Sequence, residues 1–349
     1  MKQVITLLAI VSMLLTGCLK NWDEDEYTFG ETRELGVMNM YPGALTQEGA
    51  FSIPLNDDES LWVFGETLLA DSSEIGFHAL SNSAGIHRGR GAPVGDALEW
   101  ITDSSGNLKQ LIPYNDFELE WNSDPNAPYQ YRLWPIGGVR IGEFTYIFVL
   151  KAGMVSYFDV SHWYSFLVRL DESLSATRLS SFGMIWGYGA RLDEDGYIYM
   201  QGKEARDNPD YAGFAGRFRQ DSIEFYEAYE FYNCDDRWSH LSFEACRSSW
   251  APNTSIASNA YLDAYIVIRS YYWENSIWFA KSRRQYIQDY GFEFPVSVAF
   301  PPRNFWIKNL YQHPEYERDG GKTILISYWS QQEESGPGLH LTEFEFYDR

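Results

Sequence analysis

The chain has 349 residues, of which 17% are aromatic, and it carries 49 acidic residues against 27 basic ones. Its net charge of -22 disfavours nucleic acids and anionic lipid surfaces as general partners. Aromatic side chains in this number suit an all-β core, and they also suit surfaces that bind sugars.

The chain begins with the pattern of a bacterial export signal. Lys2 supplies a positive charge, residues 4–15 are almost entirely apolar, and Thr16-Gly17-Cys18 follows. The apolar stretch is shorter than the roughly 20 residues that a membrane-spanning helix needs. Together with Leu15, the small residues before Cys18 resemble the lipobox of bacterial lipoproteins, which implies a lipidated Cys18 at a membrane. The alternative is an ordinary secretory signal with a chance cysteine.

This pattern divides the chain into three parts. Residues 1–17 are the expected signal peptide, 18–34 the lipidated cysteine with a polar tether, and 35–349 the folded domain. Leu19, rather than Asp, follows the cysteine, and resemblance to enterobacterial sorting then favours the outer membrane. Whether the domain faces the periplasm or the outside is left open.

After the tether, short aromatic and β-branched segments alternate with turns, as in an all-β protein. The clearest unit has four expected strands, at 135–141, 144–150, 165–170 and 176–182. The same order is expected at 50–55, 61–68, 79–86 and 108–112, and at 185–192, 197–202, 213–219 and 223–231. Two further units are expected at 253–260, 265–270 and 276–282, and at 310–316, 323–329 and 339–347.

Units of four antiparallel strands at regular intervals predict a five-bladed β-propeller, with a β-sandwich as the rival fold. We expect the segment 27–38 to add an edge strand to the last blade and so close the ring. In a propeller, the second strand of each blade ends at the face where the first strand starts. The residues expected around that central funnel are Glu66, Glu204, Arg269, Trp329, Trp134, Asn253, His313 and Glu315.

Three motifs resemble a bacterial domain-of-unknown-function family of five-bladed propellers. The segment 61–67 (LWVFGET) looks like the WVFGDT signature of that family, and 134–138 (WPIGG) and 313–323 look like further pieces. The resemblance spans most of residues 50–347. Because some members hydrolyse D-arabinan internally, it implies a propeller glycosidase similar to arabinanases, xylosidases and fructosidases. Glu66 stands where the signature has Asp, which places the carboxylate one methylene further from the backbone and puts the carried-over catalysis in doubt.

Glycoside hydrolysis requires two carboxyl groups, one that protonates the leaving oxygen and one that activates water or attacks carbon. We assign Glu204 as the acid and Glu66 as the base or nucleophile, with Glu315 holding a hydroxyl or tuning the acid. Lys203 and Arg206 flank Glu204 and would lower, not raise, its pKa. A salt bridge or a hydrogen bond between blades is an equally good interpretation of each glutamate alone.

Substrate contacts are expected from polar and aromatic side chains at the same rim. Arg269, His313 and Asn253 could bind hydroxyls, and Trp134, Trp250 and Trp329 could stack on sugar faces, although each also suits ordinary packing. The irregular segments 116–131 and 233–250 are the expected specificity loops.

The remaining cysteines, Cys234 and Cys246, suit a disulfide in an exported protein, with two free thiols as the alternative. No zinc-ligand spacing, P-loop or GxSxG motif accompanies them, so no cofactor is expected, and whether the central channel holds a structural ion is left open.

The leading hypothesis is a monomeric, envelope-anchored glycoside hydrolase that acts on a polysaccharide. A propeller that binds carbohydrate without cleaving it, and a scaffold for another envelope protein, are the alternatives, because one fold serves all three functions.

Overall fold

The computed structural model describes residues 30–70, 77–95, 97–156, 159–182, 185–203, 213–233, 237–240, 254–270, 277–282, 293–296, 307–332 and 336–347. Within these ranges the chain is built of β-strands, one α-helix, α2 (Asp116–Ser123), and short 3-10 helices. Several predictions fall on residues outside this part: the signal peptide, Cys18, the tether up to residue 29, Glu204, the Cys234–Cys246 pair, Trp250 and Asn253. Residues 30–34, predicted as the end of the tether, belong to a strand.

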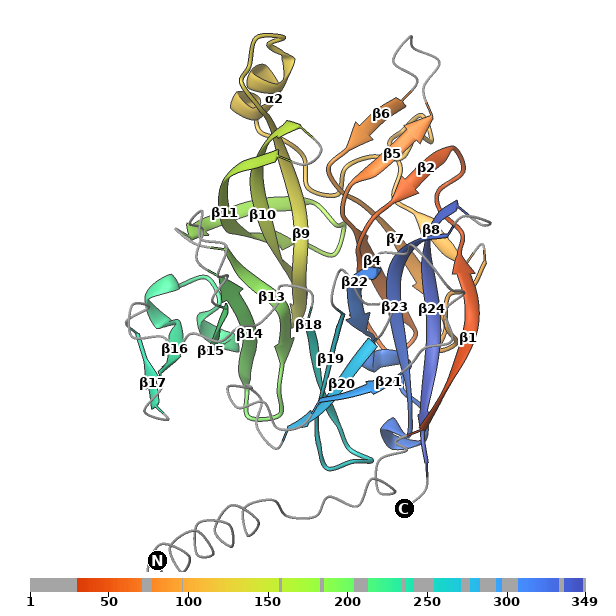
Figure 1. The fold of residues 1–349 in the computed structure, drawn as a ribbon. Helices are drawn as coiled ribbons and strands as arrows, with labels where there is room; N and C mark the ends of the chain where they lie inside the picture. The colour runs from red at the N-terminus through yellow and green to blue at the C-terminus, as the bar shows by residue number, and fades with distance from the viewer. Residues whose placement is uncertain are drawn as a thin grey trace, which may run out of the picture.

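The strands pair in antiparallel sheets, as expected (Figure 1). In the described part of the chain, the first sheet holds β3 (Ala50–Pro54), β4 (Glu59–Phe64), β7 (Ser83–Arg88) and β8 (Leu98–Trp100). The second sheet holds β9 (Gln130–Ile141), β10 (Phe144–Ser156), β11 (Asp159–Leu170) and β12 (Ala176–Phe182). A third holds β13 (Ile185–Leu192), β14 (Tyr197–Lys203), β15 (Gly213–Arg219), β16 (Glu230–Asn233) and β17 (Arg237–Ser239).

The fourth large sheet holds β18 (Thr254–Asn259), β19 (Ala264–Ser270), β20 (Ile277–Ser282) and β21 (Glu293–Val296). The fifth holds β22 (Ile307–Gln312), β23 (Thr323–Gln332), β24 (Gly336–Phe346) and β1 (Gly30–Met38). A three-stranded sheet of β2 (Ala44–Gln47), β5 (Thr67–Ala70) and β6 (Phe77–Leu80) stands apart from these.

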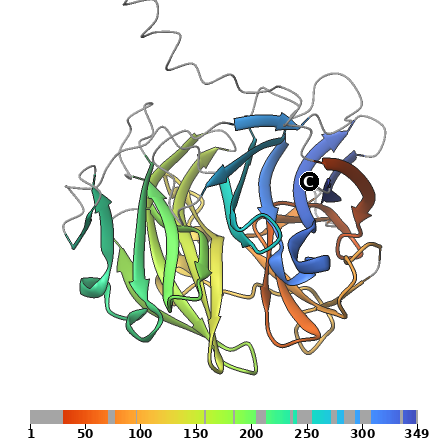
Figure 2. The same cartoon turned by 90° about the horizontal axis from the view of Figure 1, so that it is seen from below.

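The first strands of the five large sheets lie next to one another in a ring. β3 contacts β9, β9 contacts β13, β13 contacts β18, β18 contacts β22, and β22 returns to β3. Viewed along the strands, the sheets stand around this ring (Figure 2). Such radial repetition of antiparallel sheets defines a β-propeller, which confirms the predicted fold class.

Glycine allows the inner strands to approach closely. A Cβ atom on Gly137 of β9 would lie 2.2 Å from the carbonyl oxygen of Gly187 in β13. On the other side, a Cβ atom on Gly138 would lie 2.4 Å from Cδ1 of Ile53 in β3. Because real side chains do not tolerate such distances, only glycine allows β9 to pack between its two neighbours.

Two predicted strands are wrong. The outer strand of the first sheet is β8, not 108–112, and a hairpin of β5 and β6 intervenes before β7. The hairpin leaves the sheet because Gly65 N donates to the carbonyl oxygens of Glu48 and Gly49, which turns the chain toward β2. In 223–231, a turn and the 3-10 helix Tyr226–Ala228 precede β16, which begins only at Glu230, and Tyr229 Oη donates to the Ile223 carbonyl oxygen at 2.8 Å.

The N-terminal strand β1 completes the last sheet, as predicted for 27–38. It pairs with β24 from Gly30 opposite Phe346 to Met38 opposite Leu339. Glu34 lies within this contact and accepts hydrogen bonds from Tyr328 Oη at 3.0 Å and Thr342 Oγ1 at 2.6 Å. Burial raises the pKa of Glu34, but hydrogen bonds from His340, Thr342 and Tyr328 outweigh burial and leave the pKa lowered. The ring closure thus includes an ionised side chain.

The Glu34→Gln variant should weaken this closure. Because the pKa of Glu34 is lower in the folded chain than the ordinary value of 4.5, its stabilisation is full above that pH and is lost as the pH falls through the folded value. The side chain is 47% exposed, so we expect the free energy of unfolding at pH 7 to fall by only about 0.5–1 kcal/mol. Urea unfolding at pH 7 and pH 4, with hydrogen exchange of the β1 amides, measures this. Unchanged exchange in β1 at pH 7 would contradict the assignment.

Candidate functional site

Glu66 occupies the turn between β4 and β5, at the end of the channel where the inner strands begin. Its side chain is only 9% exposed, and Arg132 Nε lies 3.2 Å from Glu66 Oε1. Arg132 is the third residue of β9, and its other nitrogens donate to the Tyr131 carbonyl oxygen at 3.1 Å and to Gln130 Oε1 at 3.0 Å. A carboxylate is thus held in one orientation by an arginine that is itself held by the backbone.

Buried hydroxyl groups support the turn that carries Glu66. Thr67 Oγ1 lies 2.8 Å from Ser83 Oγ, and Gln47 Nε2 donates to the same hydroxyl at 3.1 Å. All three side chains are buried, which joins β5, β7 and β2 directly behind the carboxylate. Trp134, two residues after Arg132, is half-buried and packs against the hydrophobic core between the second and third sheets.

Helix α2 rises beside this end of the channel, within the segment that we expected to be an irregular loop (Figure 1). Its start is a capping box, in which Asn115 Oδ1 accepts from the Glu118 backbone N–H and Glu118 Oε2 accepts from the Asn115 backbone N–H. This Asn-x-x-Glu spacing is visible in the sequence and could have predicted the helix.

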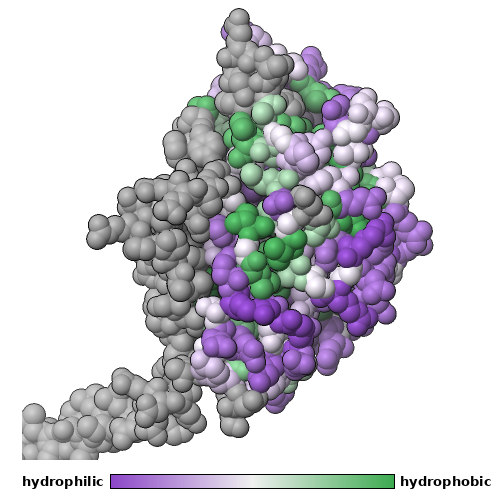
Figure 3. Space-filling view, turned by 90° about the vertical axis from the view of Figure 1, so that its right-hand side faces the viewer, coloured by the Kyte–Doolittle hydropathy of each residue, from purple (hydrophilic) through white to green (hydrophobic). Residues whose placement is uncertain are grey.

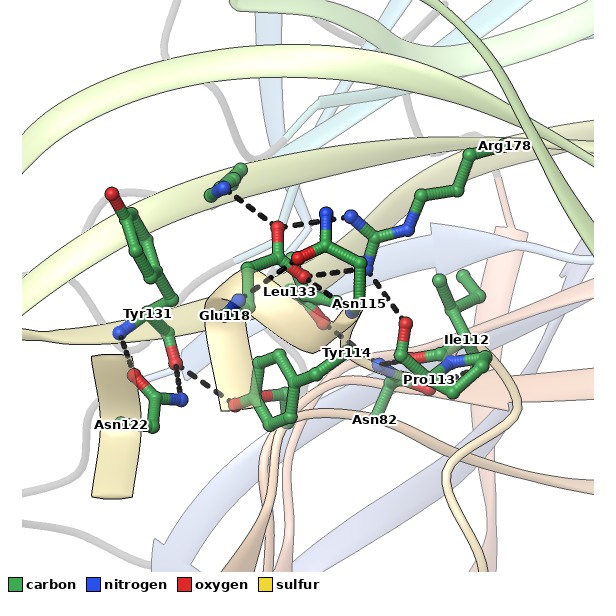
Figure 4. A network of polar contacts seen from close by, with 12 residues as sticks. Asn82, Ile112, Pro113, Tyr114, Asn115, Glu118, Asn122, Tyr131, Leu133 and Arg178 are labelled. Carbon is green, nitrogen blue, oxygen red and sulfur yellow. Dashed lines mark hydrogen bonds and ion pairs between the residues drawn. The ribbon is translucent and has the colours of Figure 1, made fainter. Parts of the chain in front are cut away.

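Glu118 also anchors α2 to the second sheet (Figure 4). The fully buried carboxylate lies 2.6 Å from Lys151 Nζ of β10 and 2.6 Å from Arg178 Nη2 of β12. Burial raises the pKa of Glu118. The hydrogen bonds from Arg178, Lys151 and the Asn115 backbone outweigh burial and leave the pKa below its ordinary value. One carboxylate therefore joins the helix to two strands.

The Glu118→Gln variant should be strongly destabilised, because it leaves Lys151 and Arg178 without their shared counter-ion. Removing one member of a buried ion pair costs about 3 kcal/mol or more. Glu120→Gln, on an exposed position of the same helix, is the matched control and should change stability by less than about 0.5 kcal/mol. Urea unfolding at pH 7 measures both, and equal stability of the two variants would contradict the pairing.

The opposite end of the channel holds a cavity of about 460 Å³. All five inner strands or the turns after them contribute to its wall, among them Ser52, Arg140, Ala190, Ser255 and Glu315. Glu315 Oε1 is buried and has no hydrogen-bond partner in the structure. Burial raises the pKa of Glu315, partly opposed by a hydrogen bond from Ser52.

The prediction that Glu315 shares a rim with Glu66 is wrong. Arg132 binds Glu66, whereas Arg140 of the same strand lines the cavity with Glu315. Eight residues of extended strand separate the Cα atoms of these arginines by roughly 26 Å, which places Glu66 and Glu315 toward different ends of the channel. The error arose because β22 begins at Ile307, so Glu315 follows an inner strand and does not begin one.

His313 and Trp329 are also buried side chains and do not form an open rim. Nδ1 of His313 lies 2.5 Å from Ser52 Oγ, Nε2 lies 2.7 Å from Ser327 Oγ, and the ring stacks on Trp62. Burial lowers the pKa of His313 to about 3, so the ring is neutral and both nitrogens are occupied. Trp329 is buried within β23. Arg269 lies on β19, but its side chain is outside the described structure.

A second acid at the cavity end, Glu317, responds to pH. Burial raises its pKa to about 7, with Gln312 Nε2 donating a hydrogen bond at 3.0 Å that opposes the rise and the charge of Glu315 adding to it. Between the ordinary value of 4.5 and about 7, the folded chain therefore keeps a proton that the unfolded chain releases. Stability consequently falls as the pH rises through this range.

Glu317→Gln should remove that fall, because an amide keeps the hydrogen bond from Gln312 but does not ionise. We expect the free energy of unfolding to rise at pH 8 by on the order of 2 kcal/mol and to change little at pH 4. Glu143→Gln, an exposed position in the turn before β10, serves as the control. Urea unfolding across pH 4–8 tests this, and a pH profile identical to that of the wild type would refute it.

The described residues contain no cluster of three or more His, Cys, Asp or Glu side chains arranged to hold a metal ion. None of the helices in these ranges has the length and apolar character to cross a membrane.

Comparison with known proteins bears on the fold. No protein-family model matches the sequence, and no curated protein matches it significantly. A candidate hydrolase from Bacteroides ovatus has a similar structure, with a TM-score of 0.58 and 13% identity over 89% of this chain and 87% of that one. A family 117 glycoside hydrolase of Zobellia galactanivorans has a TM-score of 0.50 and 8% identity, with 91% of each chain covered. At these identities the likeness shows the fold alone: a β-propeller whose structural neighbours include glycoside hydrolases.

Proposed function

We propose that this protein hydrolyses glycosidic bonds in a polysaccharide, with Glu66 as the base or nucleophile and Glu204 as the acid. The observation that supports this most directly is the Glu66 carboxylate, which Arg132 holds at 3.2 Å at the end of the propeller channel. A base or nucleophile must be ionised and correctly oriented, and a fixed guanidinium partner serves both needs. Glu204 is assigned from the sequence, because it follows the second strand of its own sheet, as Glu66 does.

In this reaction the acid protonates the leaving glycosidic oxygen while the anomeric carbon is attacked. If Glu66 activates water, the configuration at that carbon inverts, whereas direct attack by Glu66 followed by hydrolysis retains it. The separation of the two carboxyl groups distinguishes the routes, at roughly 6.5–9.5 Å for inversion and 5–5.5 Å for retention. The longer side chain of Glu66, compared with Asp in the resembling family, shifts its carboxylate toward the channel or toward Arg132.

Arabinan is the first substrate to test, since the LWVFGET and WPIGG segments resemble a family with D-arabinan hydrolases. The proposal includes lipidation of Cys18 and attachment to the bacterial envelope, most simply the outer membrane. It is supported by the charged, apolar and small-residue order of residues 2–18.

A second function, carbohydrate binding without cleavage, is favoured by the ion pair itself. A carboxylate paired with arginine is a common structural feature of proteins without catalytic activity, so Glu66 could merely join β4 to β9. Hydrolysis and binding must therefore be measured separately.

Glu66→Gln and Glu204→Gln should each reduce hydrolysis at least about 100-fold, since each removes an acid–base or nucleophilic group. Glu315→Gln is the matched control, because the structure places that carboxyl at the other end of the channel, and its activity should equal that of the wild type. Reducing ends released from arabinans, arabinogalactans and other plant and bacterial glycans measure the reaction, and thermal unfolding verifies folding.

Full activity in Glu66→Gln would remove this residue from the mechanism. Loss of activity in Glu315→Gln, with an intact fold, would contradict the placement of the site. Absence of hydrolysis across the panel, with binding to one glycan retained, would favour the second function.

A further inference from the structure

We propose that α2 and the start of β9 form an aromatic platform that binds a neutral polysaccharide chain beside Glu66. The platform consists of Phe117, Trp121, Tyr129 and Tyr131. It rests on the proposed function in one respect: it would hold sugar units next to those that are cleaved, and so make the enzyme prefer polymers to short substrates.

The four rings form one continuous group. Ring centroids lie 5.9 Å apart for Phe117 and Trp121, 6.1 Å for Phe117 and Tyr131, and 5.3 Å for Trp121 and Tyr129. Tyr129 and Tyr131 complete the group edge to face, with their hydroxyl oxygens 3.2 Å apart. Flat apolar rings bordered by hydroxyl groups match a sugar, whose C–H face is apolar and whose edge carries hydroxyls.

The platform is open to solvent, and its charge restricts the ligand. Phe117 is 56% exposed, and the partly exposed rings of Trp121, Tyr129 and Tyr131 extend it into a contiguous aromatic patch, a feature that marks binding surfaces. The exposed charged residues of helix α2 are Asp116 and Glu120, whereas Glu118 is buried and neutralised by Lys151 and Arg178. This charge disfavours nucleic acids, anionic lipids and acidic polymers and favours a neutral glycan.

The platform is also rigid. Lys151 Nζ lies 3.9 Å from the centre of the Tyr131 ring, and the same ammonium group pairs with buried Glu118. Trp121 Nε1 donates to the Tyr129 carbonyl oxygen at 3.0 Å, and Asn122 Oδ1 accepts from the Tyr131 backbone N–H at 2.7 Å. A preorganised surface of this kind loses little conformational entropy when a ligand binds.

A direct connection leads from the platform to Glu66. The Tyr131 carbonyl oxygen accepts hydrogen bonds from Tyr114 Oη, Asn122 Nδ2 and Arg132 Nη1, and Arg132 Nε pairs with Glu66 (Figure 4 shows the first two). A glycan on the rings would thus continue toward the candidate catalytic carboxylate.

Phe117→Ala tests the platform, because its ring is exposed and its loss should leave the fold intact. Leu119→Ala is the matched control on the same helix, where Leu119 is 50% exposed but aliphatic, and Phe225→Ala removes an equally exposed ring elsewhere. Affinity electrophoresis against arabinan and the other panel glycans measures binding, and KM and kcat on polymer and on short oligosaccharides measure the effect on hydrolysis.

We expect Phe117→Ala to weaken polymer binding about tenfold, the size of effect typical for loss of one aromatic anchor. KM for the polymer should rise similarly, while kinetics on short oligosaccharides and both control variants stay at wild-type values. Equal binding by Phe117→Ala and wild type, or no binding of any panel glycan by wild type, would overturn the platform. Wild type that binds through Phe117 but hydrolyses nothing would refute the proposed hydrolysis alone.

Discussion

The close contact between neighbouring inner strands is the constraint on which the rest of the molecule depends. β9 lies against β3 and β13 with no room for a side chain at Gly137 or Gly138, so the three sheets have fixed relative positions. Glu66 and Arg132 come from different sheets and can meet at 3.2 Å only if those positions are held. Backbone packing at the axis therefore determines the geometry of side chains at the channel end.

The sequence predicted the parts of this fold that local pattern controls. Alternating apolar strands, the glycines at 137 and 138 and the closing strand at 30–38 were all readable, because each depends on period, turn chemistry or an unpaired edge. Arg132 was missed, since its role comes from a partner 66 residues away and no local signal marks it. Glu315 was misplaced because it was assigned to the start of an inner strand, whereas β22 ends at Gln312 and Glu315 lies in the 3-10 helix that follows it.

The buried acids show that burial alone does not define a role. Glu118 is surrounded by two cations and a backbone N–H, which makes it a structural anchor. Glu315 lines the cavity with one oxygen that has no hydrogen-bond partner, and burial raises its pKa. Glu66 is ion-paired with Arg132 and has limited access to solvent. The charge of the neighbouring groups therefore distinguishes these glutamates better than their positions along the chain.

The direction of β1 has a consequence for how the molecule is oriented in the cell. Gly30 pairs with Phe346 at the channel end where inner strands finish, and β1 then runs toward the end that holds Glu66. Whatever precedes residue 30 is therefore joined to the far side of the propeller from α2, as Figure 1 shows. If Cys18 is lipidated, the anchor is therefore attached to the end of the propeller opposite the aromatic rings and Glu66, and access to them is not blocked by the start of β1.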